Sequence, residues 1–257
     1  MTDEAVLLTA DGPVATVTLN RPGRLNALDL EGLRLLGSRL RAAAALPGVR
    51  CVLLTGEGRA FCAGADVSPA GAATGGADGR AIVAAANDVV LTVLRADVPV
   101  VAAVNGPALG VGVSFAIACD AVVAADTSWF QLPFVKIGLV PDGGASHLVP
   151  AAVGRVRANR MALFAERVPA PAALAWGLVS DVVPAADLLD TARALAAGTA
   201  GASREALRRA KHALLQFDAL EAAMRRELDD QADLLDGPDY AEGMAALRER
   251  RDPVYPA

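Results

Sequence analysis

The chain has 257 residues, of which 54% are hydrophobic and 4% aromatic, and its formal net charge is −5. This composition predicts one large globular domain, or one domain with an appendage, whose core consists of Ala, Val and Leu, and it excludes a disordered chain. The acidic balance excludes the broad basic surface of a nucleic-acid-binding protein, although a local basic patch for one phosphorylated ligand stays open. Three irregularly spaced cysteines (Cys51, Cys62 and Cys119) predict a reducing compartment rather than a disulfide framework.

No stretch of the sequence is typical of a targeting or membrane segment. The first residues, "MTDEAVLLTADG", contain acids where a signal peptide has basic residues. The uncharged stretch from Val98 to Cys119 is long enough to cross a bilayer, but two prolines and three glycines interrupt any single helix there. We therefore expect a soluble, cytoplasmic protein that does not bind membranes.

The first half of the chain alternates between short apolar runs and helical patterns. Residues 5–20 predict a β-hairpin that turns at "ADGP", and Leu33, Leu36 and Leu40 have the spacing of a helix. "VRCVLLTG" and "VPVVAAVNG" are typical of buried parallel strands. A Gly- and Ala-rich loop precedes a helix predicted around Ile82–Leu94, "PALGVGVSFAIAC" predicts a Gly-rich turn into a helix, and "AVVAAD" and "SWFQL" predict further short strands.

After about Gly201 the sequence becomes helical, amphipathic and rich in charges of both signs. We therefore divide the chain into a core over residues 1–200 and a C-terminal helical region over residues 201–257. The charge runs of this region predict solvated helix faces, and packing against a partner subunit is the alternative for its apolar stripes.

One arrangement, an apolar strand followed by a Gly-rich turn and a helix, occurs twice. The copies are "CVLLTG…FCAGAD" and "VVAAVNG…LGVGVS". Glycine permits close approach of the backbone, and the first turn of a helix has free N–H groups. Two such turns facing each other could supply two N–H donors to one oxygen, which is the geometry of an oxyanion hole for acyl transfer or enolate formation.

The sequence matches the motifs of nucleotide-binding, hydrolase and metal-binding sites poorly. Gly110-Val111-Gly112 lacks the third glycine of a dinucleotide fingerprint, and the chain has no phosphate-loop motif and no G-x-S-x-G elbow. The two histidines, His147 and His212, fit surface or turn positions better than catalytic ones, and no cluster has the spacing of metal ligands. We expect no metal.

Four segments in order resemble the crotonase (enoyl-CoA hydratase/isomerase) superfamily. They are "RPGRLNALD", "GEGRAFCAGADV", "AAVNGPALGVGVSFAIACD" and "FQLPFVKIGLVPDGGASHLVPAAVG", and with the closing "YAEGMAALRERRDPVY" the resemblance covers nearly the whole chain. It implies an α/β fold of ββα turns wound into a spiral. It also implies C-terminal helices that form trimers, or dimers of trimers, and a coenzyme A thioester as substrate without a separate cofactor.

The resemblance also implies roles for individual residues. The backbone N–H groups of Ala65 and Val111 would form the oxyanion hole. Leu247 stands where relatives have an aromatic residue that reaches toward CoA, with Arg250 or Arg251 as the nearby basic residue. Further contacts with CoA and substrate are implied for Arg24, Leu25, Ala27, Ala63, Asp66 and Val67.

The two glutamates that hydratases of this family use are missing. Their positions are occupied by Ser114 and Phe134, so the resemblance implies inefficient hydration. Ser114 would contact the substrate or simply pack in its helix, and Phe134 would line the pocket. Isomerases of the superfamily use a single acid in the segment where this chain has Asp142, which favours an enoyl-CoA isomerase with Asp142 as acid and base.

Asp142 also has a purely local explanation, because Pro-Asp-Gly is a strong turn signal. The two roles are compatible, and neighbouring Phe134, Leu139 and Val140 should raise the pKa of its carboxyl group. The alternatives are an acyl-CoA-binding homologue without activity and an atypical hydratase whose water is held by Ser114 and Asp142. The variable segment 68–80 should line the acyl pocket and set the chain length or ring structure of the substrate.

Overall fold

The computed structural model describes residues 4–68 and 76–255. Its larger sheet has the strand order β1-β2-β3-β4-β6-β9. The predicted hairpin is confirmed, because β1 and β2 pair antiparallel, whereas the other neighbouring strands run parallel. The strands are β1 (Val6–Asp11), β2 (Val14–Leu19), β3 (Cys51–Gly56), β4 (Val100–Val104), β6 (Ala121–Ala125) and β9 (Asp181–Val183).

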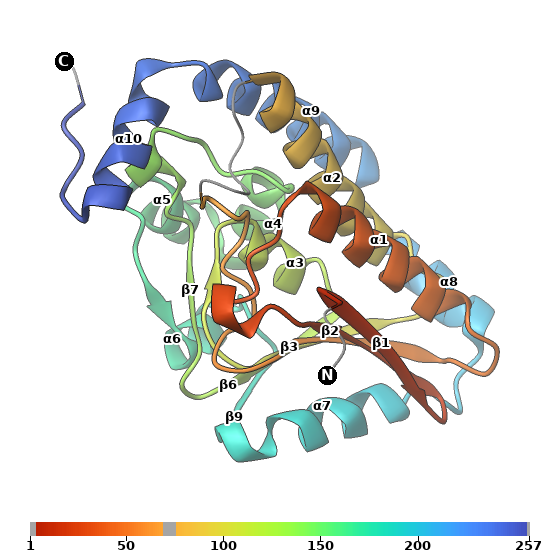
Figure 1. Cartoon of the computed structure of the whole chain (residues 1–257). Coiled ribbons are helices and arrows are strands. Elements are labelled where there is room, and N and C mark those ends of the chain that lie inside the picture. Colours follow the sequence, from red (N-terminus) through yellow and green to blue (C-terminus); the bar gives the residue numbers. More distant parts are fainter. Residues whose placement is uncertain (1–3, 69–75, 256–257) are drawn as a thin grey trace.

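Helices cover both faces of this sheet (Figure 1). The predicted leucine helix is α1 (Leu30–Ala45), and the helix predicted around Ile82–Leu94 is longer, because α2 begins at Gly76 and ends at Leu94. Both lie on one face, and α7 (Leu188–Ala197) lies on the other. Along β3 the side chains alternate accordingly: Val52 and Leu54 join the main core, and Cys51 and Leu53 pack in the smaller core that includes α7.

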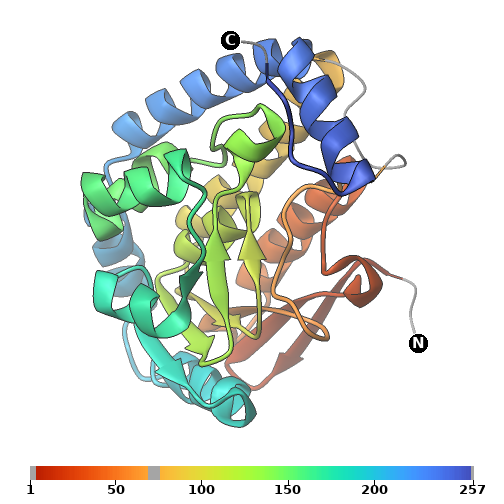
Figure 2. The same cartoon turned by 90° about the vertical axis from the view of Figure 1, so that its left-hand side faces the viewer.

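A smaller sheet of β5 (Ala108–Leu109), β7 (Trp129–Gln131) and β8 (Val168–Pro169) runs across the larger one (Figure 2). The stretch from Val98 to Cys119 is broken as predicted, into β4, β5 and α3 (Val111–Ile117). No helix among the described residues is long and apolar enough to cross a membrane.

Several short elements were not predicted individually from the sequence. Three of them are 3-10 turns: η1 (Pro22–Arg24), η2 (Phe134–Ile137) and η3 (Ala185–Asp187). The others are α4 (Ala145–Val153), α5 (Arg155–Leu163) and α6 (Ala170–Trp176), beside β8, β9 and α7.

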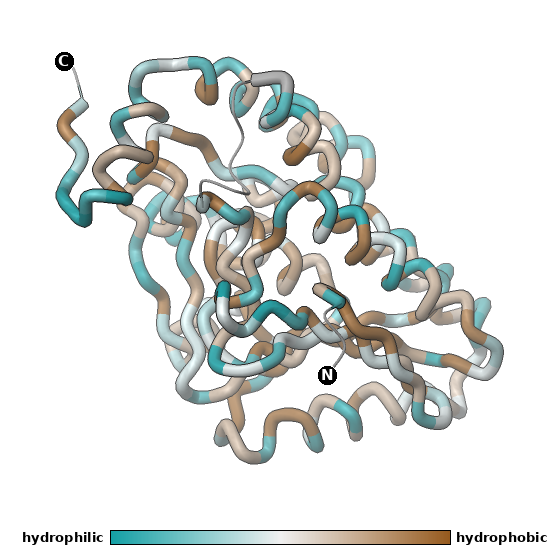
Figure 3. Tube along the Cα trace, viewed as in Figure 1, coloured by the Kyte–Doolittle hydropathy of each residue, from teal (hydrophilic) through white to brown (hydrophobic). Residues whose placement is uncertain are grey.

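The C-terminal region is helical, as expected, and consists of α8 (Arg204–Ala213), α9 (Phe217–Leu235) and α10 (Pro238–Glu249). Hydrophilic and hydrophobic residues alternate along α9 and α10 (Figure 3). Helix α9 packs against α2 and α4, and its Leu220 and Met224 belong to the main hydrophobic core. The apolar stripe of α9 is therefore buried within the same chain, and it brings α9 close to the segment that carries Asp142.

Candidate active site

The two Gly-rich turns lie directly against each other. Cys62 and Ala108 form a parallel bridge, and the N–H of Leu109 donates to the carbonyl of Cys62 at 2.9 Å. Gly64 adopts φ +90°, and a Cβ there would lie 2.9 Å from the carbonyl oxygen of Leu109 and 3.5 Å from the nitrogen of Val111. Only glycine permits this approach, because a side chain would be strained in this conformation and would also collide with backbone.

Two backbone N–H groups are free where the turns meet. Leu28 bonds to the carbonyl of Gly64 and to the N–H of Asp66, so Ala65 between them directs its own N–H to the other side. Val111 is the first residue of α3, where an N–H has no partner within the helix. Among the described residues neither N–H donates a backbone hydrogen bond, and both Ala65 and Val111 line one cavity. Their position agrees with the oxyanion hole expected from the sequence.

The conformation of the segment "RPGRLNALD" is fixed by Asn26, which is completely buried. Its side chain donates to the carbonyls of Glu57 at 3.0 Å and Ala60 at 2.8 Å and accepts from the N–H of Arg21 at 2.9 Å. These bonds offset the unfavourable left-handed conformations of Leu25 (φ 51°) and Asn26 (φ 58°). The result is a rigid corner that presents Leu25 to the cavity.

The carboxylate of Asp66 is already engaged within this corner. Its oxygens lie 3.3 Å from the Arg21 guanidinium and 3.0 Å from the N–H of Ser68. Burial acts to raise the pKa of Asp66, but the Ser68 hydrogen bonds and the charges of Arg21 and Arg24 together lower it below its usual value. Asp66 is therefore a bound, ionised group, which suits a structural role better than proton transfer.

The cavity has a volume of about 530 Å³ and is bounded by both turns, η2, α2, α9 and α10. Arg24, Ala27 and Ser114 are not among the described residues that line it. The segment predicted to line the acyl pocket lies outside the described residues over positions 69–75. The predicted site residues that line the cavity are Leu25, Ala63, Ala65, Asp66, Val67, Val111, Phe134 and Asp142.

The three C-terminal residues considered for contact with CoA differ in their surroundings. Leu247 of α10 lines the cavity. The guanidinium of Arg251 is bound to Glu242 at 2.9 Å and to Glu249 at 2.6 Å, so it forms an ion-pair cluster at the end of α10. Arg250 caps α10 in a left-handed conformation (φ 56°) and is exposed.

Asp142 is fixed beside the first turn of α3. Gly143 adopts φ +67°, and a Cβ there would lie 2.7 Å from Val111 Cγ2 and 3.0 Å from Ser114 Cβ. The hydroxyl of Ser114 donates to the backbone carbonyl of Asp142 at 2.9 Å. Ser114 is completely buried and anchors the turn from behind. The Pro-Asp-Gly turn therefore packs directly against Val111, and Asp142 and Val111 line the same cavity.

The Asp142 side chain is buried and titrates near neutral pH. The residue is only 7% exposed. Burial raises the pKa of its carboxyl group to about 7, the hydrogen bond from Gln231 opposes this rise, and the negative charge of Glu227 adds to it. Oδ2 accepts from Gln231 Nε2 at 3.0 Å, whereas Oδ1 is buried without a hydrogen-bond partner in the structure. One carboxylate oxygen therefore has no hydrogen-bond partner among the described residues, in a residue that lines the cavity.

Gln231 and Glu227 were missed by the sequence reasoning, which treated the charge runs of this region as solvated. Glu227 is 4% exposed and Gln231 is 2% exposed. A signal was available, because they continue the buried stripe of Leu220, Ala223 and Met224 at helical spacing. Polar residues at core-facing positions of an amphipathic helix indicate a buried polar partner elsewhere in the fold.

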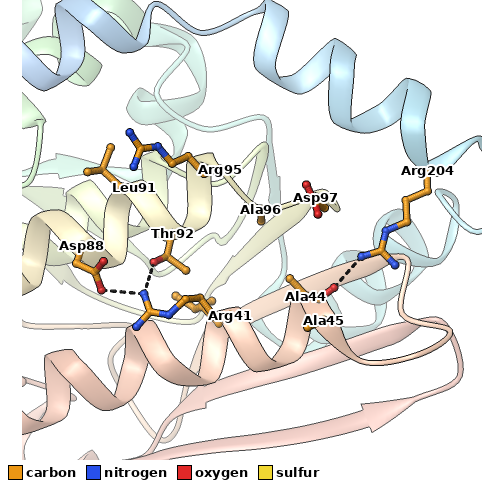
Figure 4. A pocket seen from close by; sticks show the side chains of 11 residues that line it. Arg41, Ala44, Ala45, Asp88, Leu91, Thr92, Arg95, Ala96, Asp97 and Arg204 are labelled. Atoms are coloured by element: carbon orange, nitrogen blue, oxygen red, sulfur yellow. Dashed lines mark hydrogen bonds and ion pairs between the residues drawn. The ribbon is translucent and has the colours of Figure 1, made fainter.

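A second groove, of about 410 Å³, lies between α1, α2 and the start of α8 and shares no lining residue with the cavity of Asp142. Its three arginines have partners, and Figure 4 shows those of Arg41 and Arg204. Arg41 donates to Asp88 at 2.9 Å and to Thr92 at 2.8 Å, Arg204 donates to the carbonyl of Ala44 at 2.9 Å, and Arg95 pairs with Glu221. These contacts join helices, so the three arginines of the groove serve packing between helices.

Residues 9–257 match the profile of a family described as Enoyl-CoA hydratase/isomerase. The chain belongs to the enoyl-CoA hydratase/isomerase family. It is 36% identical to the 1,2-epoxyphenylacetyl-CoA isomerase of Escherichia coli, over 98% of both chains. It is also 36% identical to a probable enoyl-CoA hydratase of Mycobacterium tuberculosis, over 96% of this chain and 98% of that one. A crystal structure of an enoyl-CoA hydratase from Mycobacterium avium subsp. paratuberculosis superposes with a TM-score of 0.90 at 40% identity, over 99% of both chains.

These similarities confirm the resemblance to the crotonase superfamily and the α/β fold expected from it. They do not separate isomerase from hydratase, because the relatives carry both names. The trimer or hexamer and the cytoplasmic location stay predictions.

Proposed function

We propose that this family member is an enoyl-CoA isomerase that moves a double bond in an unsaturated acyl-CoA thioester. Oδ1 of Asp142 removes a proton from C2, and the electron pair moves into the thioester carbonyl, whose oxygen accepts hydrogen bonds from the N–H groups of Ala65 and Val111. The resulting dienolate collapses when Asp142 returns the proton to C4. The double bond passes from the 3,4 to the 2,3 position, with no net gain or loss of protons.

The observation that carries this proposal is that Asp142, whose buried Oδ1 has no hydrogen-bond partner among the described residues, lines the same cavity as Ala65 and Val111, whose N–H groups donate no backbone hydrogen bond. A carboxyl group with a pKa of about 7 is ionised in part at neutral pH and is also a competent acid after it has taken a proton. The similarity to a 1,2-epoxyphenylacetyl-CoA isomerase supports a CoA thioester as substrate and an isomerisation as the reaction.

Hydration is the second candidate, because several relatives are named as hydratases. Among the described residues that line the cavity, the only carboxyl groups are those of Asp66 and Asp142, and Asp66 is bound to Arg21 and Ser68. The Ser114 hydroxyl, which the sequence left as a possible holder of water, donates to the Asp142 carbonyl instead. The described residues that line the cavity therefore offer no second unpaired acid that could activate a water molecule.

The test is a panel of 2-enoyl, 3-enoyl and cyclic CoA thioesters with product detection for the wild type and for Asp142→Asn. We expect isomerisation of a 3-enoyl-CoA, a loss of turnover of at least about 100-fold in Asp142→Asn, and unchanged binding of the thioester. Asp11→Asn is the matched control, because Asp11 also precedes a glycine in a turn but is exposed and far from the cavity.

Three outcomes would contradict the proposal. Wild-type turnover by Asp142→Asn would remove Asp142 from the reaction. Tight binding of acyl-CoA without turnover of any member of the panel would indicate a binding protein. Rapid conversion of crotonyl-CoA to its hydrated product, with no isomerisation, would indicate a hydratase.

A further inference from the structure

Two side chains of helix α9 accept hydrogen bonds from the loop that carries Asp142, before and after Asp142 in the chain. On one side, Gln231 accepts from the N–H of Val140 at 3.2 Å. On the other, Glu227 accepts from the N–H of Gly144 at 2.7 Å and from that of Ser146 at 2.8 Å. Glu227 and Gln231 are one helical turn apart, and so they face the same side of α9.

The contact with Val140 fixes the orientation of the Gln231 amide. An N–H can only donate, so the atom of Gln231 that faces Val140 must be its oxygen. The amide nitrogen is thereby directed at Asp142 Oδ2, at 3.0 Å. Because an amide NH₂ group has no lone pair to offer, Oδ2 must accept this bond and cannot carry a proton toward Gln231.

Unlike Oδ2, the other carboxylate oxygen of Asp142, Oδ1, does not accept a hydrogen bond from a described residue. Oδ1 is buried and has no partner in the structure, although Asp142 lines the cavity. When Asp142 is protonated, the proton therefore belongs on Oδ1 and not on Oδ2. When Asp142 is ionised, Oδ1 is the unshared acceptor.

We propose that Gln231 is a positioning residue, which assigns the transferred proton to Oδ1 of Asp142, and that Glu227 holds the far side of the same loop. This inference rests on the proposed isomerase function and deepens it. Gln231 touches the carboxylate rather than the reacting carbons, so it acts through Asp142. Its amide also stabilises the ionised form of Asp142, because a hydrogen bond to a carboxylate favours the charged state.

The elements around Asp142 present both neutral and titratable side chains. Helix α3 presents only neutral groups on this side, Val111 and Ser114. Among the described residues, the other titratable groups that line the cavity are Asp66, Lys136 and Tyr240. Glu227 of α9 bonds to the loop that carries Asp142, and His147 lies in the following helix α4.

The test compares Gln231→Leu and Gln231→Glu with the wild type. Leucine removes both hydrogen bonds of the side chain. Glutamate keeps an acceptor for the N–H of Val140 but, when ionised, has no donor for Asp142 and adds a second negative charge. Gln216→Leu is the matched control, because Gln216 is exposed at the start of the same helix and makes no capping bond with its side chain. The readout is kcat and kcat/KM for isomerisation of a 3-enoyl-CoA as a function of pH.

We expect the acidic limb of kcat/KM to move to higher pH by about one unit in Gln231→Leu and further in Gln231→Glu. At neutral pH kcat should fall at least about tenfold with little change in KM. Gln216→Leu should behave as the wild type. An unmoved limb in both Gln231 variants would overturn the inference, whether turnover is retained or falls equally at every pH, since the latter indicates a purely structural role.

The failure of this inference is distinguishable from that of the proposed function. If Asp142→Asn is inactive while both Gln231 variants keep the wild-type pH profile, only the role of Gln231 is wrong. If Asp142→Asn retains turnover, the proposed function itself is wrong.

Discussion

Replacing Asp142 by Asn changes the pH dependence of stability as well as the chemistry. The pKa of this carboxyl group is raised from 3.8 to about 7 by burial. Between these two values the folded protein holds a proton that the unfolded chain has lost, so its stabilising effect is complete below about pH 4 and is lost as the pH rises through about 7. Because asparagine does not titrate, the stability of the Asn variant does not fall in this way as the pH rises.

The magnitude follows from the pKa difference. Each unit corresponds to about 1.4 kcal/mol, so the rise of about three units limits the total loss to about 4 kcal/mol. Between about pH 5 and about pH 8 the wild type loses about 3 kcal/mol of this stability. The stability of Asp142→Asn relative to the wild type should increase by this amount over that interval. Effects of the substitution that do not depend on pH, such as a weaker bond to Gln231, cancel in the comparison.

The assay is urea denaturation of both proteins at the two pH values, at equal protein concentration so that any association affects them alike. Asp11→Asn serves as the control and should show no comparable change, because Asp11 is exposed. If the stability difference between Asp142→Asn and the wild type changes by less than about 1 kcal/mol, the carboxyl group is not held near neutral pKa in the folded protein, and the argument from burial fails.

Three further predictions test the surroundings of the site. Val111→Pro removes one N–H of the proposed oxyanion hole at a helix position that accepts proline, so the chain should fold and kcat should fall about 100- to 1,000-fold; normal kcat would exclude that N–H. Glu227→Gln removes a negative charge that raises the pKa of Asp142, so the acidic limb of kcat/KM should move to lower pH, and a shift upward would contradict the assignment. Lys211→Met leaves the partly buried carboxylate of Asp120 without the ammonium group 2.8 Å away, and thermal or urea denaturation should show a loss of about 3 kcal/mol; a loss below about 1 kcal/mol would show that the pair is dispensable.

The features that the sequence predicted well are those with a local physical cause. Apolar runs such as "CVLLTG" and "VVAAV" formed the buried parallel strands, because a strand that is covered on both faces needs continuous hydrophobic residues. The glycines of the two turns predicted a close approach of backbone to ligand, and Gly64 requires this freedom. The family resemblance rested on the same segments. For this reason the sequence could name Ala65 and Val111 as candidates for an oxyanion hole before the structure was described, and the hole itself stays a prediction.

Elements without a strong local signal were not predicted individually, among them the short β8 and β9. Strands of two or three residues are stabilised almost wholly by their neighbours in the sheet, so their sequences carry little information. The role of Ser114 was left open between two alternatives for a similar reason. Its residue type permits either packing or substrate contact, and only the 2.9 Å bond to the Asp142 carbonyl distinguishes the two.

By itself, the sequence determined the fold and the family, and it singled out Asp142 as the candidate acid. Whether the carboxyl group of Asp142 is solvated or buried depended on atoms distant along the chain. Gln231, which binds its carboxylate, is 89 residues away, and Glu227, whose charge raises its pKa, is on the same helix. Desolvation and Coulomb interaction act through space, so the tertiary structure alone decided which oxygen of Asp142 is free.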